Sequence, residues 1–382
     1  MLFLKPTTVF GSEANSSVEL GLIGCGSRGN WIAPFFRDQA AARIVAVADV
    51  IRENLDKTRD KLGIDSSQAY YGPDAYGELA NAKLDGVIIE TPTYYHPEHA
   101  LAAVEAGKHV YLAKPVAVDV PGCHTILEAG RKAGGKVSFW VDFQTRARPV
   151  FQEAAQRVHR GDIGKTVFGQ VFYYTGRAIP DRSRPGMDPG LARILNFYVD
   201  RVLGGDIIVE QNIHVIDMAN WYIGAHPIKA TGMGGRTDWA GTGYDAGDAY
   251  DHFAVNFWYP GDVQASFSSH QLNGSFADLC VRLTGVKGTA DTHYGGLVRI
   301  TGQNAWNGAE KDDTFRSGAI ANVKAFIESV RTGQHINNAD QAVESNLTAI
   351  LGRTAAYEQR VVTWDEMMKS NERLHADLKL RW

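Results

Sequence analysis

The sequence predicts an α/β protein of two domains: a parallel sheet with helices on both faces, followed by an α+β domain with a large open, predominantly antiparallel sheet. At 382 residues the chain is too long for one small core. Short apolar strands alternate with helical segments as far as residue 142, which is typical of a parallel sheet. From Thr166 the strands become longer and alternate apolar with polar residues, as in an antiparallel sheet with one buried face. We therefore divide the chain into an N-terminal arm, 1–17, and two domains, 18–145 and 146–382.

The composition excludes two classes of partner. A formal net charge of −4, with no local block of Lys or Arg, provides no basic surface for nucleic acid. No run reaches the roughly 18 apolar residues that a membrane-spanning helix needs. The three cysteines, Cys25, Cys123 and Cys280, show neither zinc-ligand spacing nor a disulfide framework, so the sequence predicts no metal site.

The stretch from Val18 to Asp49 predicts a dinucleotide site. An apolar strand leads directly into Gly24-Cys25-Gly26-Ser27-Arg28-Gly29, and a helical segment and a second strand follow. Gly24 permits a tight turn, Gly26 lets the backbone approach a pyrophosphate, and Gly29 lets the helix pack closely on the strand. The free N–H groups at the start of the helix, at Ser27 and Arg28, are suited to hold the phosphates.

Asp49 indicates which dinucleotide binds. It ends the second strand 20 residues after Gly29, where a carboxylate can accept hydrogen bonds from both ribose hydroxyls. The same charge repels a 2′-phosphate, and Val50 and Ile51 supply no cation. Only Arg52 could reach around to a 2′-phosphate, so the sequence favours NAD over NADP.

Two further strands deliver polar residues to the same edge of the sheet. The strand 85–90 ends in Thr91-Pro92-Thr93-Tyr94-Tyr95-His96, and the strand 109–112 ends in Ala113-Lys114-Pro115. Carboxyl ends of parallel strands meet at the crevice where ligands bind, so we assign Thr91, Pro92, His96 and Lys114 to that crevice. An ammonium there can hydrogen-bond a substrate hydroxyl and ease the loss of its proton. The alternative for an isolated Lys-Pro is a surface turn.

The segment 204–217 carries the candidate proton acceptor. On one continuous helix, Glu210, His214 and Asp217 would share a face, and a carboxylate beside an imidazole orients it and raises its basicity. That arrangement suits the removal of a hydroxyl proton. The same pattern leaves two alternatives: a metal site, for which no third ligand has a fitting spacing, and a helix with one buried histidine.

Taken together, these motifs resemble the glucose–fructose oxidoreductase/inositol dehydrogenase (Gfo/Idh/MocA) family over nearly the whole chain from Val18 onward. The motifs that match it in order are the glycine loop, residues 91–96, Gly107-Lys108-His109-Val110, Lys114-Pro115 and the Gly-Gly…His…Asp block of 204–217. The resemblance implies an N-terminal Rossmann domain, a C-terminal domain with an open, predominantly antiparallel sheet, and homo-oligomers, dimers or tetramers, formed through the open face of that sheet.

Carried over position by position, the resemblance implies catalytic roles for Lys114 and His214. The family's aspartate four residues before the histidine is Glu210 in this chain. The glutamate that commonly precedes Lys-Pro is Ala113, and the glycine two residues before the histidine is Asn212. These departures leave the sugar and the oxidised carbon open.

The resemblance implies an NAD-dependent oxidoreductase acting on a secondary hydroxyl of a sugar, polyol or glycoside, with a small carbohydrate as its binding partner. In this reading His214, oriented by Glu210, takes the hydroxyl proton and Lys114 stabilises the oxyanion. Two alternatives stay open: a glycoside hydrolase or lyase that uses tightly bound NAD by oxidation, elimination and reduction, and a non-catalytic sugar or dinucleotide sensor. Weaker candidates for sugar contacts are Arg146, Tyr173, Tyr174 and Asn196.

The N-terminal arm resembles the end of a twin-arginine leader. Residues 209–214 are also similar to a subgroup of the family that is commonly exported in the folded state by that route. We therefore expect a periplasmic protein, with the cytoplasm as the alternative.

Overall fold

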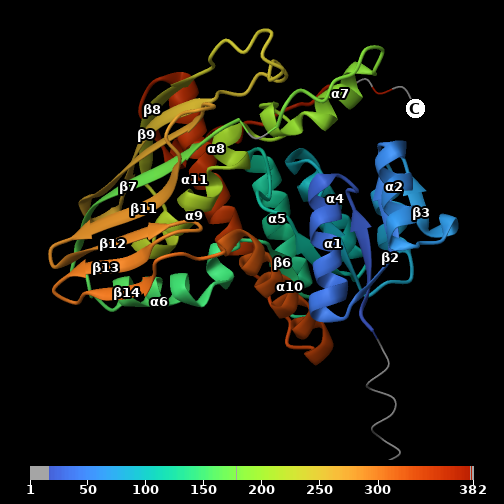
Figure 1. The fold of residues 1–382 in the computed structure, drawn as a ribbon, viewed down its shortest axis with the longest axis horizontal. Helices are drawn as coiled ribbons and strands as arrows, with labels where there is room; N and C mark the ends of the chain where they lie inside the picture. The colour runs from blue at the N-terminus through green and yellow to red at the C-terminus, as the bar shows by residue number, and fades with distance from the viewer. Residues whose placement is uncertain (1–16, 178, 379, 381–382) are drawn as a thin grey trace, which may run out of the picture.

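The computed structural model describes residues 17–177, 179–378 and 380, so the predicted N-terminal arm lies outside the described residues apart from Ser17. Two sheets organise the molecule, one in each half of the ribbon, and helices lie between them (Figure 1). The predicted fold class is confirmed. Within the described residues, no helix is both long enough and apolar enough to cross a membrane.

The first sheet has six parallel strands in the order β3-β2-β1-β4-β5-β6. The order reverses between β1 and β4, and ligands bind at such a reversal, beyond the carboxyl ends of the strands. The strands are β1 (Glu19–Ile23), β2 (Arg43–Asp49), β3 (Ala69–Tyr71), β4 (Gly86–Ile89), β5 (His109–Leu112) and β6 (Phe139–Val141). The helices of this part are α1 (Ser27–Ala40), α2 (Arg52–Leu62), α3 (Ala75–Asn81), α4 (His96–Glu105) and α5 (Val120–Ala133).

Helices cover both faces of this sheet because its strands are apolar at successive positions. In β4, Val87 packs with α4 and α5, whereas Ile88 belongs to a second apolar cluster with α1. That second cluster also contains α10 (Thr314–Thr332), and the rings of Phe326 and Tyr111 lie 5.5 Å apart between centroids. A helix from the C-terminal part of the chain therefore completes the core of the first domain.

The second sheet has nine strands in the order β14-β13-β12-β11-β7-β10-β9-β8-β15. Every neighbouring pair is antiparallel except β7 and β10. The strands are β7 (Thr166–Thr175), β8 (Lys229–Gly235), β9 (His252–Tyr259), β10 (Val263–Gln271), β11 (Asp278–Gly285), β12 (Gly288–His293), β13 (Val298–Gly302), β14 (Trp306–Ala309) and β15 (Val362–Thr363). The sequence does not predict β12, because its residues lack an apolar alternation.

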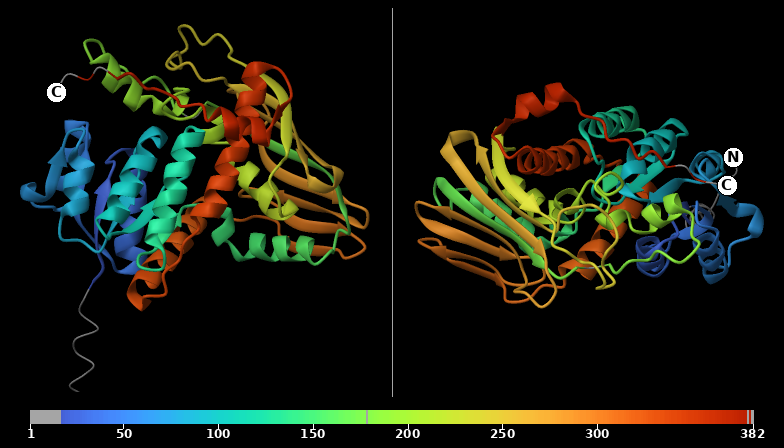
Figure 2. Two further views of the ribbon diagram at one scale, coloured as in Figure 1. Left: turned by 180° about the vertical axis from the view of Figure 1, so that it is seen from behind. Right: turned by 90° about the horizontal axis from the view of Figure 1, so that it is seen from above.

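Within the part of the chain that the structure describes, helices cover one face of the second sheet and leave the other bare (Figure 2). The covering helices include α6 (Pro149–His159), α9 (Ile213–Ile223) and α11 (Ala339–Glu358). Alternation along the strands follows this division: Val171 and Phe267 belong to the buried core, whereas Phe168 and Met233 are exposed.

The prediction of one continuous helix through Glu210 and His214 is wrong. A short helix, α8 (Ile207–Glu210), ends at Glu210, and α9 begins only at Ile213. The backbone N–H of Asn212 reaches back five residues to the carbonyl of Ile207, at 3.0 Å, and this wide turn closes α8. Glu210 and His214 therefore lie on two different helices, and their relative placement no longer follows from helical spacing.

The C-terminal tail returns to the first domain after α12 (Trp364–Ser370). Ala376, Leu378 and Leu380 pack in a small apolar cluster with residues of α7 (Pro189–Leu195) and with Val50 and Ile51, which follow β2. The guanidinium of Arg193 donates a hydrogen bond to the carbonyl of Ala376 at 2.6 Å. Figure 1 shows the tail running beside α7 above the first sheet.

Candidate active site

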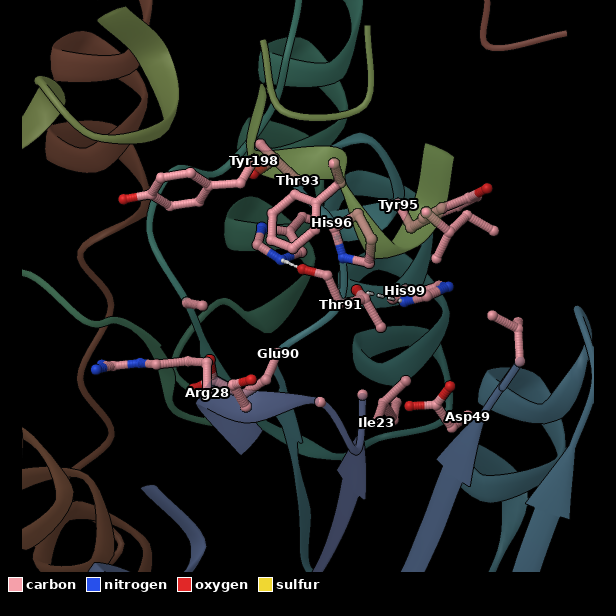
Figure 3. A pocket seen from close by; sticks show the side chains of 18 of the residues that line it. Ile23, Arg28, Asp49, Glu90, Thr91, Thr93, Tyr95, His96, His99 and Tyr198 are labelled. Atoms are coloured by element: carbon pink, nitrogen blue, oxygen red, sulfur yellow. Dashed lines mark hydrogen bonds and ion pairs between the residues drawn. The ribbon is translucent and has the colours of Figure 1, made fainter. Parts of the chain in front are cut away.

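A cavity of about 540 Å³ lies beyond the carboxyl ends of the parallel strands and reaches residues of the second domain. Figure 3 looks into it, with Asp49 at the end of β2 and Arg28 and Glu90 along one side. Most of the predicted site residues line this one cavity: Gly24, Gly26, Ser27, Arg28, Asp49, Thr91, Pro92, His96, Lys114, Tyr173, Glu210 and His214.

The glycine loop has the shape that a pyrophosphate requires. Gly24 has a φ of 98°, and a Cβ atom there would lie 2.6 Å from the backbone of Glu90. A Cβ on Gly29 would lie 2.1 Å from the carbonyl oxygen of Gly24, so this glycine lets α1 pack against the turn. A Cβ on Gly26 would meet nothing within 4 Å. Gly26 therefore faces open space at the start of α1, and the loop fits a dinucleotide phosphate.

Asp49 is fixed beside this loop. One carboxylate oxygen accepts the backbone N–H of Cys25, and the other accepts that of Ile51, both at 2.7 Å. Burial raises the pKa of Asp49 to about 6, although these hydrogen bonds lower it. The Arg52 guanidinium lies 3.7 Å from the ring centroid of Tyr71. The carboxylate therefore stands where it can accept hydrogen bonds from the two hydroxyls of a ribose, and these residues fit the adenosine end of the cofactor.

Arg28 extends from the glycine loop to two acidic residues that end strands. It forms an ion pair with Asp142, after β6, and its Nε lies 3.6 Å from Oε2 of Glu90, after β4. Both carboxylate oxygens of Glu90 are buried, and neither has a hydrogen-bond partner among the residues that the structure describes. Burial raises the pKa of Glu90 to about 7, although Arg28 lowers it. Glu90 therefore places an unpaired acceptor in the wall of the cavity.

Lys114 of the first domain is in direct contact with Glu210 of the second domain. The Lys114 ammonium donates a hydrogen bond to the backbone carbonyl of Glu210 at 2.7 Å, and lies 3.8 Å from Oε1 of its carboxylate. The Thr93 hydroxyl donates to the other carboxylate oxygen at 2.6 Å. Burial lowers the pKa of Lys114 and raises that of Glu210, and each charge opposes the shift of the other. Glu210 thus contacts Lys114 and Thr93 in place of the predicted contact with His214.

His214 presents a neutral imidazole to the cavity. Burial, followed by the Lys114 and Arg28 cations, holds its pKa well below the usual range. Its Nδ1 is buried without a hydrogen-bond partner among the described residues. The ring of Tyr294 lies 5.3 Å away between centroids, and the Tyr294 hydroxyl donates to Gln144 at 2.5 Å. A neutral imidazole next to an ammonium can accept a proton from a hydroxyl while the ammonium stabilises the resulting oxyanion.

His96 lines the cavity, and both ring nitrogens also face backbone carbonyl oxygens: those of Pro115 at 2.7 Å and Thr91 at 2.8 Å. Burial lowers its pKa to about 4, so the neutral ring has a single N–H and donates to one of the two carbonyls. The ring joins the loops after β4 and β5.

Three of the four weaker candidates do not line the cavity. Arg146 forms a double hydrogen bond with the buried Asp217, and Ser345 donates to the same carboxylate. Tyr174 lies on the outer face of the second sheet, stacked on His270. Asn196 is buried and hydrogen-bonds the loop before α7. Only Tyr173 faces the cavity.

The cavity also contains polar residues that the sequence did not indicate: Glu90, Gln144, Tyr198, Gln211 and Tyr294. Glu90 carries a readable signal, since it is a carboxylate directly after a buried parallel strand. Gln144, Tyr198 and Tyr294 lie on loops or after unpredicted elements, and no motif marks them.

Comparisons with known proteins identify the family of the chain. Residues 18–142 match the family model described as oxidoreductase family, NAD-binding Rossmann fold, and residues 151–291 match the Gfo/Idh/MocA C-terminal domain. Myo-inositol 2-dehydrogenase of Thermotoga maritima is 26% identical over 92% of this chain and 100% of its own length. D-glucoside 3-dehydrogenase of Escherichia coli is 26% identical over 56% of this chain and 57% of its own length.

Solved structures show the same fold. The crystal structure of scyllo-inositol dehydrogenase from Lactobacillus casei with bound NAD(H) and scyllo-inositol superposes with a TM-score of 0.71 at 19% identity. The match covers 92% of this chain and 100% of that one. With both halves of the chain matched and the dinucleotide loop in place, the protein belongs to the Gfo/Idh/MocA family of oxidoreductases, whose N-terminal domain is an NAD-binding Rossmann fold.

Proposed function

We propose that the protein is an NAD-dependent dehydrogenase that oxidises a secondary hydroxyl of a sugar, polyol or glycoside. The observation that carries this proposal is that Lys114, Glu210 and His214 line the same cavity as the glycine loop and Asp49. The inositol and glucoside dehydrogenases among the relatives support the substrate class.

Lys114 binds the reacting hydroxyl, and His214 accepts its proton. The Lys114 ammonium, held by the carbonyl of Glu210, donates a hydrogen bond to the reacting hydroxyl and lowers the cost of its ionisation. His214, neutral because burial and two cations lower its pKa, accepts the proton. The bound nicotinamide supplies the hydride acceptor. Tyr173, Gln211 and Tyr294 line the same part of the cavity and are available to hydroxyls of the substrate.

The arrangement at Asp49 favours NAD over NADP. A 2′-phosphate would approach a carboxylate that is already held by two backbone N–H groups. Arg52, the cation that follows Asp49 in the sequence, lies over the ring of Tyr71. Changing the preference therefore requires a change at Asp49 itself.

A substrate screen with two variants tests the proposal. Purified protein is assayed with NAD against inositols, free sugars and methyl glycosides, following nicotinamide absorbance, and products are identified by mass. We expect His214→Ala and Lys114→Ala to lose about 10²–10⁴ in kcat while binding NAD like the parent protein. Variants as fast as the parent would refute the assignment. Release of free sugar from a chromogenic glycoside without net NADH would instead assign the oxidation–elimination–reduction reaction.

A further inference from the structure

Asp278, Cys280 and His293 come together on the bare face of the second sheet. Asp278 and Cys280 are two residues apart on β11, so their side chains point to the same face. Their neighbours Leu279 and Val281 pack into the core on the opposite face. His293, on β12, is the direct cross-strand partner of Cys280. The three ligand-type atoms all lie within 4.8 Å of one another.

These three side chains offer one thiol, one imidazole and one carboxylate to a single point. Cys280 is fully buried, and Asp278 and His293 are partly buried. The Nδ1 atom of His293 lies 2.7 Å from Oδ1 of Asp278. Two such atoms bound to one tetrahedral zinc ion lie about 3.3 Å apart, so a small side-chain rotation admits the ion.

A fourth residue orients the imidazole. The Nε2 atom of His293 lies 3.1 Å from Oδ1 of Asp291. That carboxylate is itself held by Arg282 at 2.9 Å and by Arg299 at 3.2 Å. In the metal-free structure both ring nitrogens face carboxylate oxygens, so both donate an N–H. A zinc ion would take the place of the Nδ1 proton, while Nε2–H continues to donate to Asp291. A histidine ligand that donates its other N–H to a carboxylate is the usual arrangement in metal sites.

We propose that Asp278, Cys280 and His293 bind a zinc ion, with water as the fourth ligand and Asp291 as the hydrogen-bond acceptor that orients His293. A set of sulfur, nitrogen and oxygen ligands in tetrahedral geometry selects zinc over magnesium or calcium, which take oxygen ligands. The two arginines offset the charge of Asp291 and keep it out of the inner ligand set.

The ion would act on structure, because it is held on the face opposite to α9, the helix that carries His214. It joins β11 to β12 at the residue before Tyr294, whose ring lines the active-site cavity. The backbone N–H of Tyr294 already donates to the carbonyl of Leu279, between the two β11 ligands, at 2.7 Å. A bound zinc ion would therefore fix the end of β12, from which the side chain of Tyr294 enters the cavity.

Metal content and cobalt spectra of the full-length protein test this site. The protein is prepared without a histidine tag, dialysed against a chelator and titrated with Zn²⁺ or Co²⁺. We expect one zinc per chain, a higher Tm with zinc than without it, and a sulfur-to-cobalt absorption band in the near ultraviolet.

Four variants and one control make the result specific. Cys280→Ser is expected to abolish the sulfur-to-cobalt band, and Asp278→Asn and His293→Gln to lose the bound zinc. Asp291→Asn should weaken zinc binding by about 10–100-fold. The control is His252→Gln, because His252 also pairs with an aspartate, Asp251 at 2.7 Å, but has no cysteine beside it. NAD binding, followed by fluorescence, shows that each variant is folded.

Two results would overturn the proposal. A chelated protein that takes up no stoichiometric zinc and gives no cobalt–thiolate band contains only an ion-pair network at this place. Zinc that is bound equally well by the parent, Cys280→Ser and His293→Gln lies elsewhere in the chain.

Discussion

The ammonium of Lys114 donates its hydrogen bond to the backbone carbonyl of Glu210, at 2.7 Å, while the side chain of Glu210 accepts one from Thr93. One residue of the second domain thus binds the loops after both β4 and β5. The backbone carbonyl of Glu210 fixes the position of the ammonium. The carboxylate of the same residue, 3.8 Å from Nζ, raises the pKa of the ammonium.

Replacing the carboxylate separates these two functions. Glu210→Gln keeps the backbone contact but removes the charge that does most to raise the pKa of Lys114, which burial already lowers. We expect kcat to fall about 10–100-fold and its alkaline limb to move to lower pH, with NAD affinity unchanged. Glu210→Asp, which restores a carboxylate, should recover most of the rate. A Gln variant with the parent's pH profile would show that the charge plays no part.

Glu90 should make the stability of the cofactor-free protein depend on pH. Burial raises its pKa from 4.5 to about 7, so the folded protein binds this proton more tightly than the unfolded chain. The resulting stabilisation is complete below about pH 4.5 and is lost as the pH rises through about 7. Glu90→Gln is uncharged throughout, so it should exceed the parent in stability by about 3 kcal/mol at pH 8 and by little at pH 5.

Thermal unfolding at the two pH values measures this difference. Glu78→Gln is the control, because Glu78 is an exposed carboxylate on α3. A gain for Glu90→Gln of the same size at pH 5 and pH 8 would mean that the effect arises from packing and not from charge.

Asp49 is expected to control the choice between the two dinucleotides. Asp49→Asn retains an acceptor for the N–H of Cys25 but removes the negative charge near the ribose. NAD affinity should fall about tenfold through loss of a charge-assisted hydrogen bond, while NADP affinity should rise. Fluorescence titration with both dinucleotides measures the ratio. Asp74→Asn, at another acidic residue of the same cavity, controls for a general change in charge, and a matching ratio in both variants would contradict the prediction.

The C-terminal tail is expected to slow the release of the cofactor. Leu378 and Leu380 pack with Val50 and Ile51, directly after Asp49, and Leu380 also lines the cavity. The double variant Leu378→Ala/Leu380→Ala should release NAD about tenfold faster, since each truncation removes partly buried apolar groups. Stopped-flow displacement measures the rate, with Met233→Ala on the bare sheet face as the control. An unchanged rate would show that the tail does not restrict exit.

The sequence predicted every strand of the first sheet except β3, and it predicted the dinucleotide loop, because both depend on local rules. Gly29 is required by a contact five residues away, with the carbonyl oxygen of Gly24, and Gly24 itself has a positive φ and packs against Glu90. The strands of the first sheet are short continuous apolar runs, which single-sequence patterns reveal.

The parts that could not be predicted depend on distant segments. The predicted pairing of Glu210 with His214 assumed one continuous helix. The backbone hydrogen bond from Asn212 to Ile207 ends that helix before His214. Tyr294 reaches the cavity from the end of β12, a strand whose residues show no apolar alternation. The group of Asp278, Cys280 and His293 has no metal-binding spacing in the sequence, because its spacing comes from strand alternation and cross-strand pairing.

The position of α10 has a consequence for how the chain is made. Residues 314–332 supply Phe326, which packs against Phe36 and Tyr111 of the first domain. During synthesis the first 142 residues leave the ribosome long before this helix exists, so the Rossmann domain must wait with one apolar face uncovered. The core of the cofactor domain is therefore completed only by a segment that is synthesised after most of the second domain.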